Sequence, residues 1–514
     1  MDRPLPSRIY SIQETIDTRG DLALNADVMR RAAALASGIA ITSIVSVTLS
    51  RAVPTDTDSR SVDAKIKKVE TGLTGRVHIQ GRPFPNWTVQ ERMTHYHVPA
   101  VSLAVVNNGS LEWAKAYGWK EAGRPVPADK ETLFQAASVS KVITALATLR
   151  LVQRKDLGLQ DDVSERLHSW KLPNPSGDAV TIDELLSHSA AINWPPGESA
   201  LPAGGSLPTL LQRLKGEPPA LNKPVQVDGT PGAAFRYSNG GYLILGELIS
   251  DTTGKDFSES AEELVFKPLH MAHSTFKALT PDSAPKDIAV GHTADGAVEE
   301  GKWRAVGAPE GGLWTTASDL AQAMIAIQRS FRGDRGSFLS ASLAKQMLTK
   351  QNDRWGLGVQ LQGSGDTLAF RHDGSTPGYK AVLLAYASRG QGAIILTNGD
   401  RGGELADELL YSIAAAYDWP DFRVTEKRII EINPEELKQF VGKYEMAPGA
   451  YATVTLENGK LYGQVRGRDQ TELLPETTTK FFMIEGPTVE FEKDSSGKVT
   501  ALVFDGNFRA KRVP

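Results

Sequence analysis

A serine and a lysine three positions apart, Ser138 and Lys141, form the first candidate for chemistry in this chain. On a helix, residues at this spacing lie on one face, so the lysine amine can reach the serine hydroxyl. A buried lysine that loses part of its preference for the charged form can accept the hydroxyl proton and activate the serine as a nucleophile. The pair therefore predicts acyl transfer through a covalent serine intermediate.

The same Ser-x-x-Lys spacing occurs elsewhere in the chain, so spacing alone does not identify the nucleophile. The other pairs are Ser274/Lys277, Ser283/Lys286, Ser342/Lys345 and Ser495/Lys498. Only Ser138 opens a strongly apolar segment, which runs to Gln153 and is typical of a helix buried inside a domain. Free N–H groups and the helix dipole at its start favour developing negative charge. Two structural alternatives stay open: Ser138 as a simple N-cap, and Lys141 extended to the surface.

Two further motifs follow in chain order, and each occurs once. They are Tyr237-Ser238-Asn239, as Tyr-x-Asn, and His372-Asp373-Gly374, as His-x-Gly. The second continues through Ser375 into an apolar run at Ala381, which places it at the start of a strand. A strand edge beside a helix N-terminus can supply an N–H group to an oxyanion hole, and a side chain at Gly374 would block the approach of substrate. Taken alone, both motifs could be turns.

The order of Ser138-x-x-Lys141, Tyr237-x-Asn239 and His372-x-Gly374 resembles the serine β-lactamase and penicillin-binding protein superfamily. The similarity is to the branch of class C β-lactamases, D-alanyl-D-alanine carboxypeptidases, D-aminopeptidases and β-lactamase-like esterases, in which stretches like residues 185–189 and 311–316 are also common. It covers residues 85–420. The resemblance implies an α/β fold: an antiparallel sheet flanked by helices, together with an all-α region.

The resemblance also implies catalytic roles. Ser138 would form the acyl-enzyme, Lys141 would be the general base, and Tyr237 would share the proton relay. Asn239 would orient Lys141 and the substrate amide, and the N–H groups of Ser138 and Ser375 would form the oxyanion hole. No class A type Ser-Asp-Asn motif is found, so deacylation would depend on Tyr237 or on the substrate.

His372 departs from the family pattern, because many members carry a lysine at this place and use it to bind the substrate carboxylate. A histidine that is neutral for much of the time near pH 7 would bind a carboxylate less well. The resemblance with this departure implies a serine hydrolase acting on an ester or amide: a carboxylesterase, a D-amino-acid peptidase or a weak β-lactamase. The alternative is a catalytically degenerate scaffold that binds a ligand or serves assembly.

Composition limits the other classes of function. The net charge of −4 and the pI near 6.2 argue against a nucleic-acid partner, which usually requires a basic surface. The chain has no cysteine, which excludes disulfides, thiol catalysis and thiolate metal sites. His95 and His97 form a close pair without a third ligand, so no metal and no other cofactor is expected. A small-molecule ester, peptide or β-lactam is the expected partner, and the oligomeric state stays open.

The N-terminal 52 residues predict export. Arg30 and Arg31 precede an apolar run from Ala32 to Leu49, and Ser50-Arg51-Ala52 offers a small-x-small cleavage site. This pattern is typical of a secretory signal peptide starting at Met29. A retained membrane anchor is the second interpretation and a buried helix the third. We therefore expect a secreted or periplasmic protein, with any membrane association confined to this segment.

A chain of 514 residues exceeds what one hydrophobic core supports, so we expect two folded domains. Residues 53–84 are polar and predict an irregular linker. Residues 101–106 and 111–118 predict a hairpin, and residues 381–387 and 392–397 predict two further strands. After residue 420 short strands follow one another, including a hairpin around Asn458-Gly459. This spacing predicts a small all-β barrel or sandwich. Residues 430–514 resemble the lipocalin-like barrel that follows the catalytic domain in some members of the superfamily, and this resemblance implies the barrel.

Overall fold

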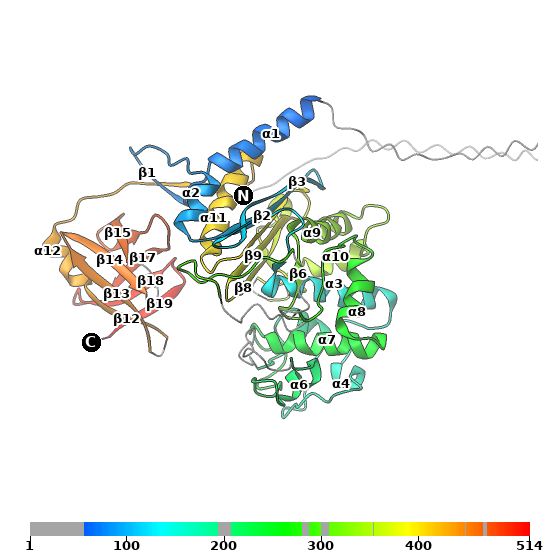
Figure 1. Cartoon of the computed structure of the whole chain (residues 1–514). Helices are drawn as coiled ribbons and strands as arrows, with labels where there is room; N and C mark the ends of the chain where they lie inside the picture. Colours follow the sequence, from blue (N-terminus) through cyan, green and yellow to red (C-terminus); the bar gives the residue numbers. More distant parts are fainter. Residues whose placement is uncertain are drawn as a thin grey trace, which may run out of the picture. The chain divides into compact units, whose positions relative to one another are not determined.

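The computed structural model describes residues 56–193, 207–279, 287–299, 308–352, 354–447, 449–465 and 470–513. The signal-peptide or anchor prediction for residues 1–52 therefore lies outside the described residues. Within the described part of the chain, no helix is both long enough and apolar enough to cross a membrane. Two folded parts are present, a larger domain of sheet and helices followed by a β-barrel (Figure 1).

A seven-stranded antiparallel sheet is the centre of the larger domain, with the strand order β4-β3-β2-β10-β9-β8-β7. Its strands, in chain order, are β2 (Ala100–Asn107), β3 (Ser110–Glu121), β4 (Arg124–Pro127), β7 (Gln360–Gln362), β8 (Ala369–Thr376), β9 (Tyr379–Tyr386) and β10 (Gly392–Thr397). The predicted hairpin is confirmed as β2–β3, where Asn108 and Gly109 turn the chain with positive φ angles of 51° and 70°. The two predicted later strands are confirmed as β9 and β10.

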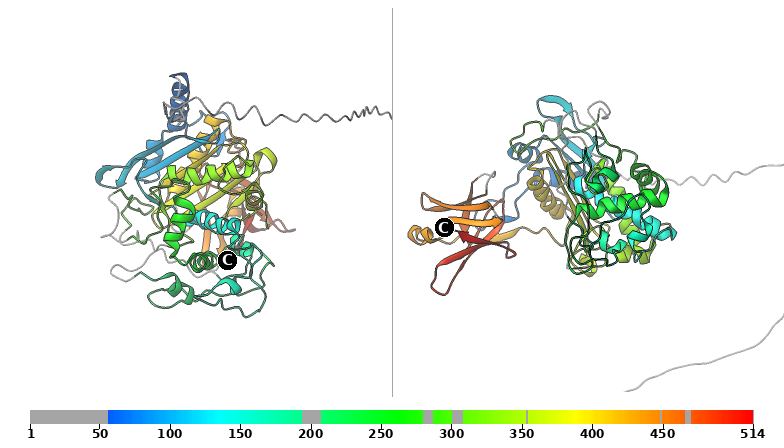
Figure 2. Two further views of the ribbon diagram at one scale, coloured as in Figure 1. Left: turned by 90° about the vertical axis from the view of Figure 1, so that its right-hand side faces the viewer. Right: turned by 90° about the horizontal axis from the view of Figure 1, so that it is seen from below.

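Helices cover both faces of this sheet, as the two views in Figure 2 show. One face packs against α1 (Asp56–Thr71), α2 (Val89–His95) and α11 (Gly402–Tyr417); the other packs against α9 (Ala317–Arg332). The residues of β2 alternate between the two cores, with Leu103 on the α11 side and Ala104 on the α9 side. A strand buried on both faces requires the continuous apolar run that the sequence has here.

The prediction of an irregular linker over residues 53–84 is wrong for most of that stretch. Residues Asp56–Thr71 form α1, and Val77–Ile79 form β1, which pairs in parallel with β11 (Thr425–Lys427). The helix packs on α11 through a narrow apolar stripe made of Val62, Ile66 and Val69. This spacing follows the helical repeat. An ordinary amphipathic helix of this length has more apolar residues on its buried face. The segment as a whole is therefore polar, and for this reason the sequence did not indicate a helix here.

An all-helical region lies beside the sheet and contains α3 (Ser140–Arg154) at its centre. The other helices are α4 (Val163–Arg166), α5 (Ile182–Leu186), α6 (Leu210–Lys215), α7 (Asn239–Thr253), α8 (Phe257–Ala261) and α10 (Ala341–Met347). Helix α3 contacts α7 and α8 and is buried along almost its whole length. A helix that is apolar nearly all round fits only such a position.

The C-terminal part forms a closed barrel of eight antiparallel strands, drawn in orange and red in Figure 1. Its strands are β12 (Gly442–Ala447), β13 (Ala450–Glu457), β14 (Lys460–Val465), β15 (Thr471–Pro475), β16 (Lys480–Phe482), β17 (Thr488–Lys493), β18 (Val499–Phe504) and β19 (Phe508–Val513). Helix α12 (Pro434–Leu437) precedes them. The predicted hairpin at Asn458-Gly459 is confirmed as β13–β14. Closure leaves no unpaired strand edge in the barrel to which another chain could pair.

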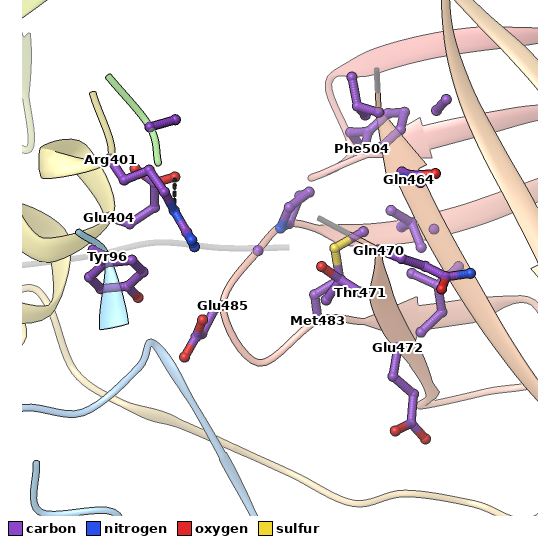
Figure 3. A pocket seen from close by; sticks show the side chains of 18 of the residues that line it. Tyr96, Arg401, Glu404, Gln464, Gln470, Thr471, Glu472, Met483, Glu485 and Phe504 are labelled. Atoms are coloured by element: carbon purple, nitrogen blue, oxygen red, sulfur yellow. Dashed lines mark ion pairs between the residues drawn. The ribbon is translucent and has the colours of Figure 1, made fainter. Parts of the chain in front are cut away.

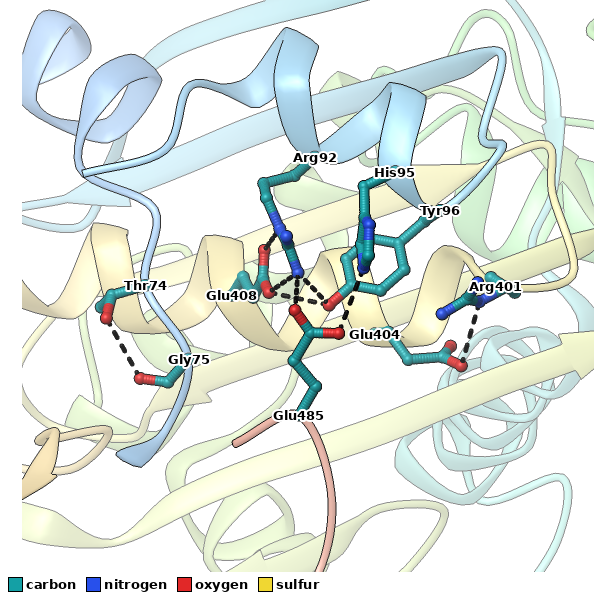
Figure 4. Close-up of polar contacts among 9 residues, drawn as sticks. All are labelled: Thr74, Gly75, Arg92, His95, Tyr96, Arg401, Glu404, Glu408 and Glu485. Atoms are coloured by element: carbon teal, nitrogen blue, oxygen red, sulfur yellow. Dashed lines mark hydrogen bonds and ion pairs between the residues drawn. The ribbon is translucent and has the colours of Figure 1, made fainter. Parts of the chain in front are cut away.

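One loop of the barrel reaches the larger domain through Glu485. Its carboxylate accepts hydrogen bonds from Arg92 at 2.5 Å and from His95 at 3.1 Å. The guanidinium of Arg92 also binds Glu408 of α11 at 2.7 Å, and the hydroxyl of Tyr96 donates to the same carboxylate (Figure 4). Burial is the largest influence on the pKa of Glu408 and raises it, while Arg92 and Tyr96 oppose that shift.

A cavity of about 1050 Å³ lies between the same two parts of the chain. Figure 3 shows Tyr96, Arg401 and Glu404 on the side of the larger domain, and Met483 and Phe504 on the side of the barrel. Charged and apolar groups line it together, so its lining does not favour one class of ligand.

Candidate active site

The turn that carries Ser138 joins a short strand to a buried helix. Strand β5 (Phe134–Gln135) leads into a 3₁₀ turn, η1 (Ala137–Val139), which runs directly into α3. Ala137 has φ of +45°, a left-handed conformation that residues with a side chain rarely adopt. The N-cap residue of α3 is Val139, and it makes no side-chain capping bond. Ser138 is therefore not the helix cap, and its hydroxyl is free for another role.

Lys141 lies on the first turn of α3 and is completely buried. Its Nζ donates hydrogen bonds to Oγ of Ser138 at 3.2 Å and to the main-chain oxygen of Glu310 at 2.7 Å. The alternative of a lysine extended to the surface is wrong, because the side chain has no exposed area. Of the other Ser-x-x-Lys pairs, Ser274 instead donates to Asp319 at 2.9 Å.

A segment far along the chain, residues 308–313, holds the first turns of α3. The hydroxyl of Thr144 donates to the carbonyl of Pro309 at 2.7 Å, and the N–H of Leu313 donates to the hydroxyl of Ser140 at 3.0 Å. The segment is itself a tight turn, with the N–H groups of Gly311 and Gly312 both bonded to the Ala308 carbonyl. The glycine pair is thus a turn, and it brings the Glu310 carbonyl to Lys141.

The Tyr-x-Asn motif lies at the start of α7. Ser238 is the N-cap, accepting from the N–H of Gly241, and Asn239 is the first helical residue. The ring of Tyr237 lies with its centroid 5.0 Å from Nζ of Lys141, so the structure brings the three predicted catalytic residues together. The Oδ1 of Asn239 is buried without a hydrogen-bond partner among the described residues. It is therefore an acceptor available to a substrate N–H group or to a rearranged Lys141.

His372 lies on β8, buried, with its ring centroid 6.4 Å from that of Tyr237. Its Nδ1 lies 2.8 Å from the main-chain oxygen of Asp373, and because a carbonyl only accepts, Nδ1 must carry the proton. Burial, with a smaller contribution from the charge of Lys141, lowers the pKa of His372 to about 3. At neutral pH the ring is uncharged, and its buried Nε2 is a hydrogen-bond acceptor.

Gly374 and Ser375 follow on the same strand. A Cβ atom on Gly374 would lie 2.1 Å from the carbonyl oxygen of Ala136, so this glycine is needed for close packing of β8 on the turn before Ser138. The contact is a reason for glycine additional to the one expected from the sequence, and the expectation that a side chain here would block substrate stays a prediction. The exposed side chain of Ser375 lies on the opposite face of β8 from His372 and lines the cavity of Figure 3. The oxyanion role of its N–H group stays a prediction.

Sequence reasoning missed an aromatic cluster around Tyr237. The ring of His188 lies 4.2 Å from that of Tyr237, and Trp355 lies 5.0 Å from His188 and 5.4 Å from His372. Nδ1 of His188 accepts from the N–H of Ser238 at 3.2 Å. Burial chiefly, with a smaller contribution from the charge of Lys141, holds the pKa of His188 well below its usual range. Residues 185–189 stood out in the sequence and could have indicated His188, but nothing in the sequence marked Trp355.

In the described ranges, no group of three or more His, Cys, Asp or Glu side chains is arranged to hold a metal ion. His95, one of the two neighbouring histidines seen in the sequence, instead binds Glu485.

Comparison with known families and sequences identifies two matching domain families. The family model described as "Beta-lactamase" matches residues 86–418, and a domain of unknown function (DUF3471) matches residues 426–512. Protein flp of Staphylococcus aureus (strain MRSA252) is 31% identical over 223 residues, which are 43% of this chain and 42% of that protein. The chain thus aligns with less than half the length of that relative. Penicillin-binding protein 4* of Bacillus subtilis (strain 168) is 24% identical over 430 residues, covering 77% of this chain and 90% of that protein.

Solved structures share the fold. The octameric penicillin-binding protein homologue from Pyrococcus abyssi superposes with a TM-score of 0.57 at 22% identity, covering 82% of this chain and 98% of that one. D-amino acid amidase from Ochrobactrum anthropi superposes with a TM-score of 0.53 at 19% identity, covering 64% and 97%. At these identities the likeness concerns the fold, and activity has to be argued from the site.

Proposed function

The chain belongs to the β-lactamase family, and on that premise we propose that it is a serine hydrolase that cleaves an ester or amide through an acyl-enzyme on Ser138. One observation carries the proposal: the Nζ of a fully buried lysine, Lys141, lies 3.2 Å from Oγ of Ser138. A buried amine in reach of a hydroxyl is the arrangement that general-base activation of a nucleophile requires.

The proposed mechanism has two halves. In the first, the unprotonated form of Lys141 takes the hydroxyl proton while Oγ of Ser138 attacks the substrate carbonyl, and the proton then passes to the leaving group as its bond to the acyl carbon breaks. In the second, water attacks the acyl carbon, the bond from that carbon to Oγ breaks, and a proton of the water passes to Oγ, so that the hydroxyl of Ser138 is restored and the carboxylic acid leaves. The carbonyl of Glu310 accepts one N–H of Lys141 at 2.7 Å. This bond favours a rotamer in which the remaining hydrogen and the lone pair of the unprotonated amine face the site. Tyr237, beside Lys141, would share the proton transfer.

His372 supports a substrate that does not depend on carboxylate recognition at this position. The ring is neutral and offers a lone pair at Nε2 rather than a positive charge or an N–H group. A carboxylate placed against this atom would gain no hydrogen bond, whereas an N–H or O–H group would. We therefore favour carboxylic esters and amides over penicillins and over peptides bound through a terminal carboxylate.

The test is covalent labelling followed by turnover. The full chain is treated with a p-nitrophenyl ester, and intact-mass analysis records the acyl adduct; rates are then measured on the ester, a D-alanyl peptide and a chromogenic cephalosporin. We expect the adduct on the wild type and its loss in Ser138→Ala and Lys141→Met, with the ester turned over fastest. Ser342→Ala and Lys345→Met are matched controls, because they have the same spacing on the exposed face of α10. An adduct that persists in Ser138→Ala contradicts the proposal.

A catalytically inactive scaffold is the second candidate function. Its supporting observation is His372 itself, which removes the charge that many members of the superfamily use at this position. Absence of both the adduct and turnover on all three substrates would favour it over the hydrolase.

Export is part of the proposal as well. It rests on the charged and apolar pattern of residues 30–52. Expression of the full chain in a bacterium, followed by fractionation and N-terminal sequencing, tests it. Mature protein starting near residue 53 in the periplasm or medium is expected, and full-length protein in the cytosol contradicts export.

A further inference from the structure

We propose that the buried ion pair between Arg213 and Glu310 is a positioning device for the general base: it fixes the main-chain carbonyl that holds Lys141. This inference rests on the proposed hydrolase function and adds two residues to its machinery, neither of which touches substrate.

The contacts form a continuous path. Nη2 of Arg213 donates to Oε1 of Glu310 at 2.5 Å, and the two side chains are 5% and 8% exposed. The main-chain oxygen of the same Glu310 accepts from Nζ of Lys141 at 2.7 Å, and that Nζ reaches Ser138. Arg213 is therefore linked to Ser138 through Glu310 and the amine of Lys141. Any shift of Glu310 changes the direction in which the Lys141 amine points.

Helix α6 is a firm anchor for Arg213. Its N-terminus is closed by a capping box between Thr209 and Gln212. At its other end the carbonyl of Arg213 accepts from Nδ2 of Asn222 at 2.7 Å, and Val225 bonds back to Leu214. The turn at Glu310 is held from a second direction by α7. A Cβ atom on Gly246 would lie 2.1 Å from Pro309, which shows how closely that proline packs on the helix. Two helices thus fix the position of the Glu310 carbonyl.

Stability does not account for this pair. Two charges taken out of water lose hydration, and replacing a buried ion pair by apolar side chains of similar size is often neutral or stabilising. The cost is larger when hydrogen-bonding atoms are left over. Nε and Nη1 of Arg213 and Oε2 of Glu310 are buried without hydrogen-bond partners in the described part of the chain. A costly pair placed one residue from the lysine contact is better explained by what it does for that lysine.

The ionisable side chains that surround the Lys141 amine carry little charge of their own. The other ionisable groups around the amine are His188 and His372, whose pKa values are lowered by burial, and Tyr242, whose pKa burial raises well above its usual range. Tyr237 also faces the amine. His188, His372 and Tyr242 are uncharged near neutral pH. Removing one member of the pair therefore leaves the other member buried without its counter-charge, at or one contact away from the residue that binds Lys141.

The experiment compares Arg213→Met, Glu310→Gln and the double variant Arg213→Met/Glu310→Met. Acylation by a p-nitrophenyl ester is followed against pH, and rates are divided by the number of active sites titrated in the burst. Arg213→Met leaves the Glu310 carboxylate, which favours the protonated amine, so the acid limb of the pH profile should move up by about one unit. Glu310→Gln leaves the guanidinium of Arg213, which disfavours the protonated amine, so the acid limb of the pH profile should move down. In the double variant the acid limb should return to its wild-type position. Its kcat should stay about 10²-fold below the wild-type value with KM little changed, because the main-chain carbonyl of Glu310 is no longer fixed.

A merely structural role predicts another pattern: fewer titratable sites, with unchanged pH limbs and unchanged kcat per site. That result would overturn the inference, as would limbs that move in the same direction in both single variants. If Arg213→Met does not fold, Glu310→Gln, which has nearly the same size, carries the test alone. Lys255→Met is the control, since it removes an exposed ion pair with Glu263 of the same 2.5 Å length. Failure of the proposed function is distinguishable, because the wild type would then form no acyl adduct at all.

Discussion

Replacing Gly374 with alanine tests how closely β8 must approach the turn that carries Ser138. The added Cβ atom would lie 2.1 Å from the carbonyl oxygen of Ala136, two residues before the nucleophile. The main chain fixes the position of the Cβ atom, and the oxygen belongs to the main chain, so rotation of a side chain cannot relieve the clash. Either the strand or the turn has to move by about 1 Å, and a misplacement of this size costs about 10²-fold in rate.

The same substitution should lower stability by an overpacking cost of about 1–3 kcal/mol. Gly374 does not have the left-handed backbone that only glycine tolerates easily, so conformational strain adds nothing to this figure. The expected result is therefore a folded protein with a lower melting temperature and slow acylation, rather than an unfolded one.

The assay for Gly374→Ala is the acylation rate per titrated site with a p-nitrophenyl ester, together with the free energy of unfolding in urea. Gly403→Ala is the control, because a Cβ there meets nothing within 4 Å in the first turn of α11. That variant should acylate at the wild-type rate and gain about 0.5–1 kcal/mol, since alanine suits a helix better than glycine. A wild-type acylation rate in Gly374→Ala would refute the view that β8 sets the position of the Ser138 turn.

Two further predictions concern stability. Because the pKa of His372 falls from 6.5 to about 3 on folding, unfolding takes up a proton below pH 6.5, and stability should decline by about 1.4 kcal/mol per pH unit down to about pH 3. Urea unfolding at pH 7 and pH 5 should show this extra loss in the wild type but not in His372→Asn; equal losses would count against a neutral buried ring. Arg92→Met should cost about 3–5 kcal/mol, because Glu408 is left buried without its cation. Glu485→Gln should lower the free energy of unfolding by about 1 kcal/mol or less, because this side chain is partly exposed. Equal losses in the two variants, measured by urea unfolding, would contradict the view that Glu408 is the carboxylate that depends most on Arg92.

Local sequence signals predicted those elements whose partners are near in the chain. The β2–β3 hairpin and the β13–β14 hairpin both carry Asn-Gly at the turn, where positive φ angles are needed. The mixed α/β domain and the closed barrel were predicted from strand spacing and from the family resemblance. Helix α1 was missed because its buried stripe is only one residue wide at Val62, Ile66 and Val69.

The candidate site was predicted where each residue carries its own motif. Ser138, Lys141 and Tyr237 come together as expected, since Ser-x-x-Lys needs only a helix and Tyr-x-Asn needs only a helix start. Trp355 and Arg213 were not found, because each reaches the site from an element whose sequence has no catalytic pattern. Their roles depend on tertiary packing, which periodicity does not encode.

The contact that completes the Ser138–Lys141 pair shows most clearly why motif spacing was insufficient. The amine of Lys141 needs an acceptor other than Ser138, or its hydrogens compete for the oxygen that it has to deprotonate. The structure supplies that acceptor from a main-chain carbonyl at Glu310, 169 positions away. Every residue has such a carbonyl, so no residue type could mark this one. The sequence does contain a charged residue, Glu310, at this position. Its ion pair with Arg213 is the feature that points to this turn as the one that positions Lys141.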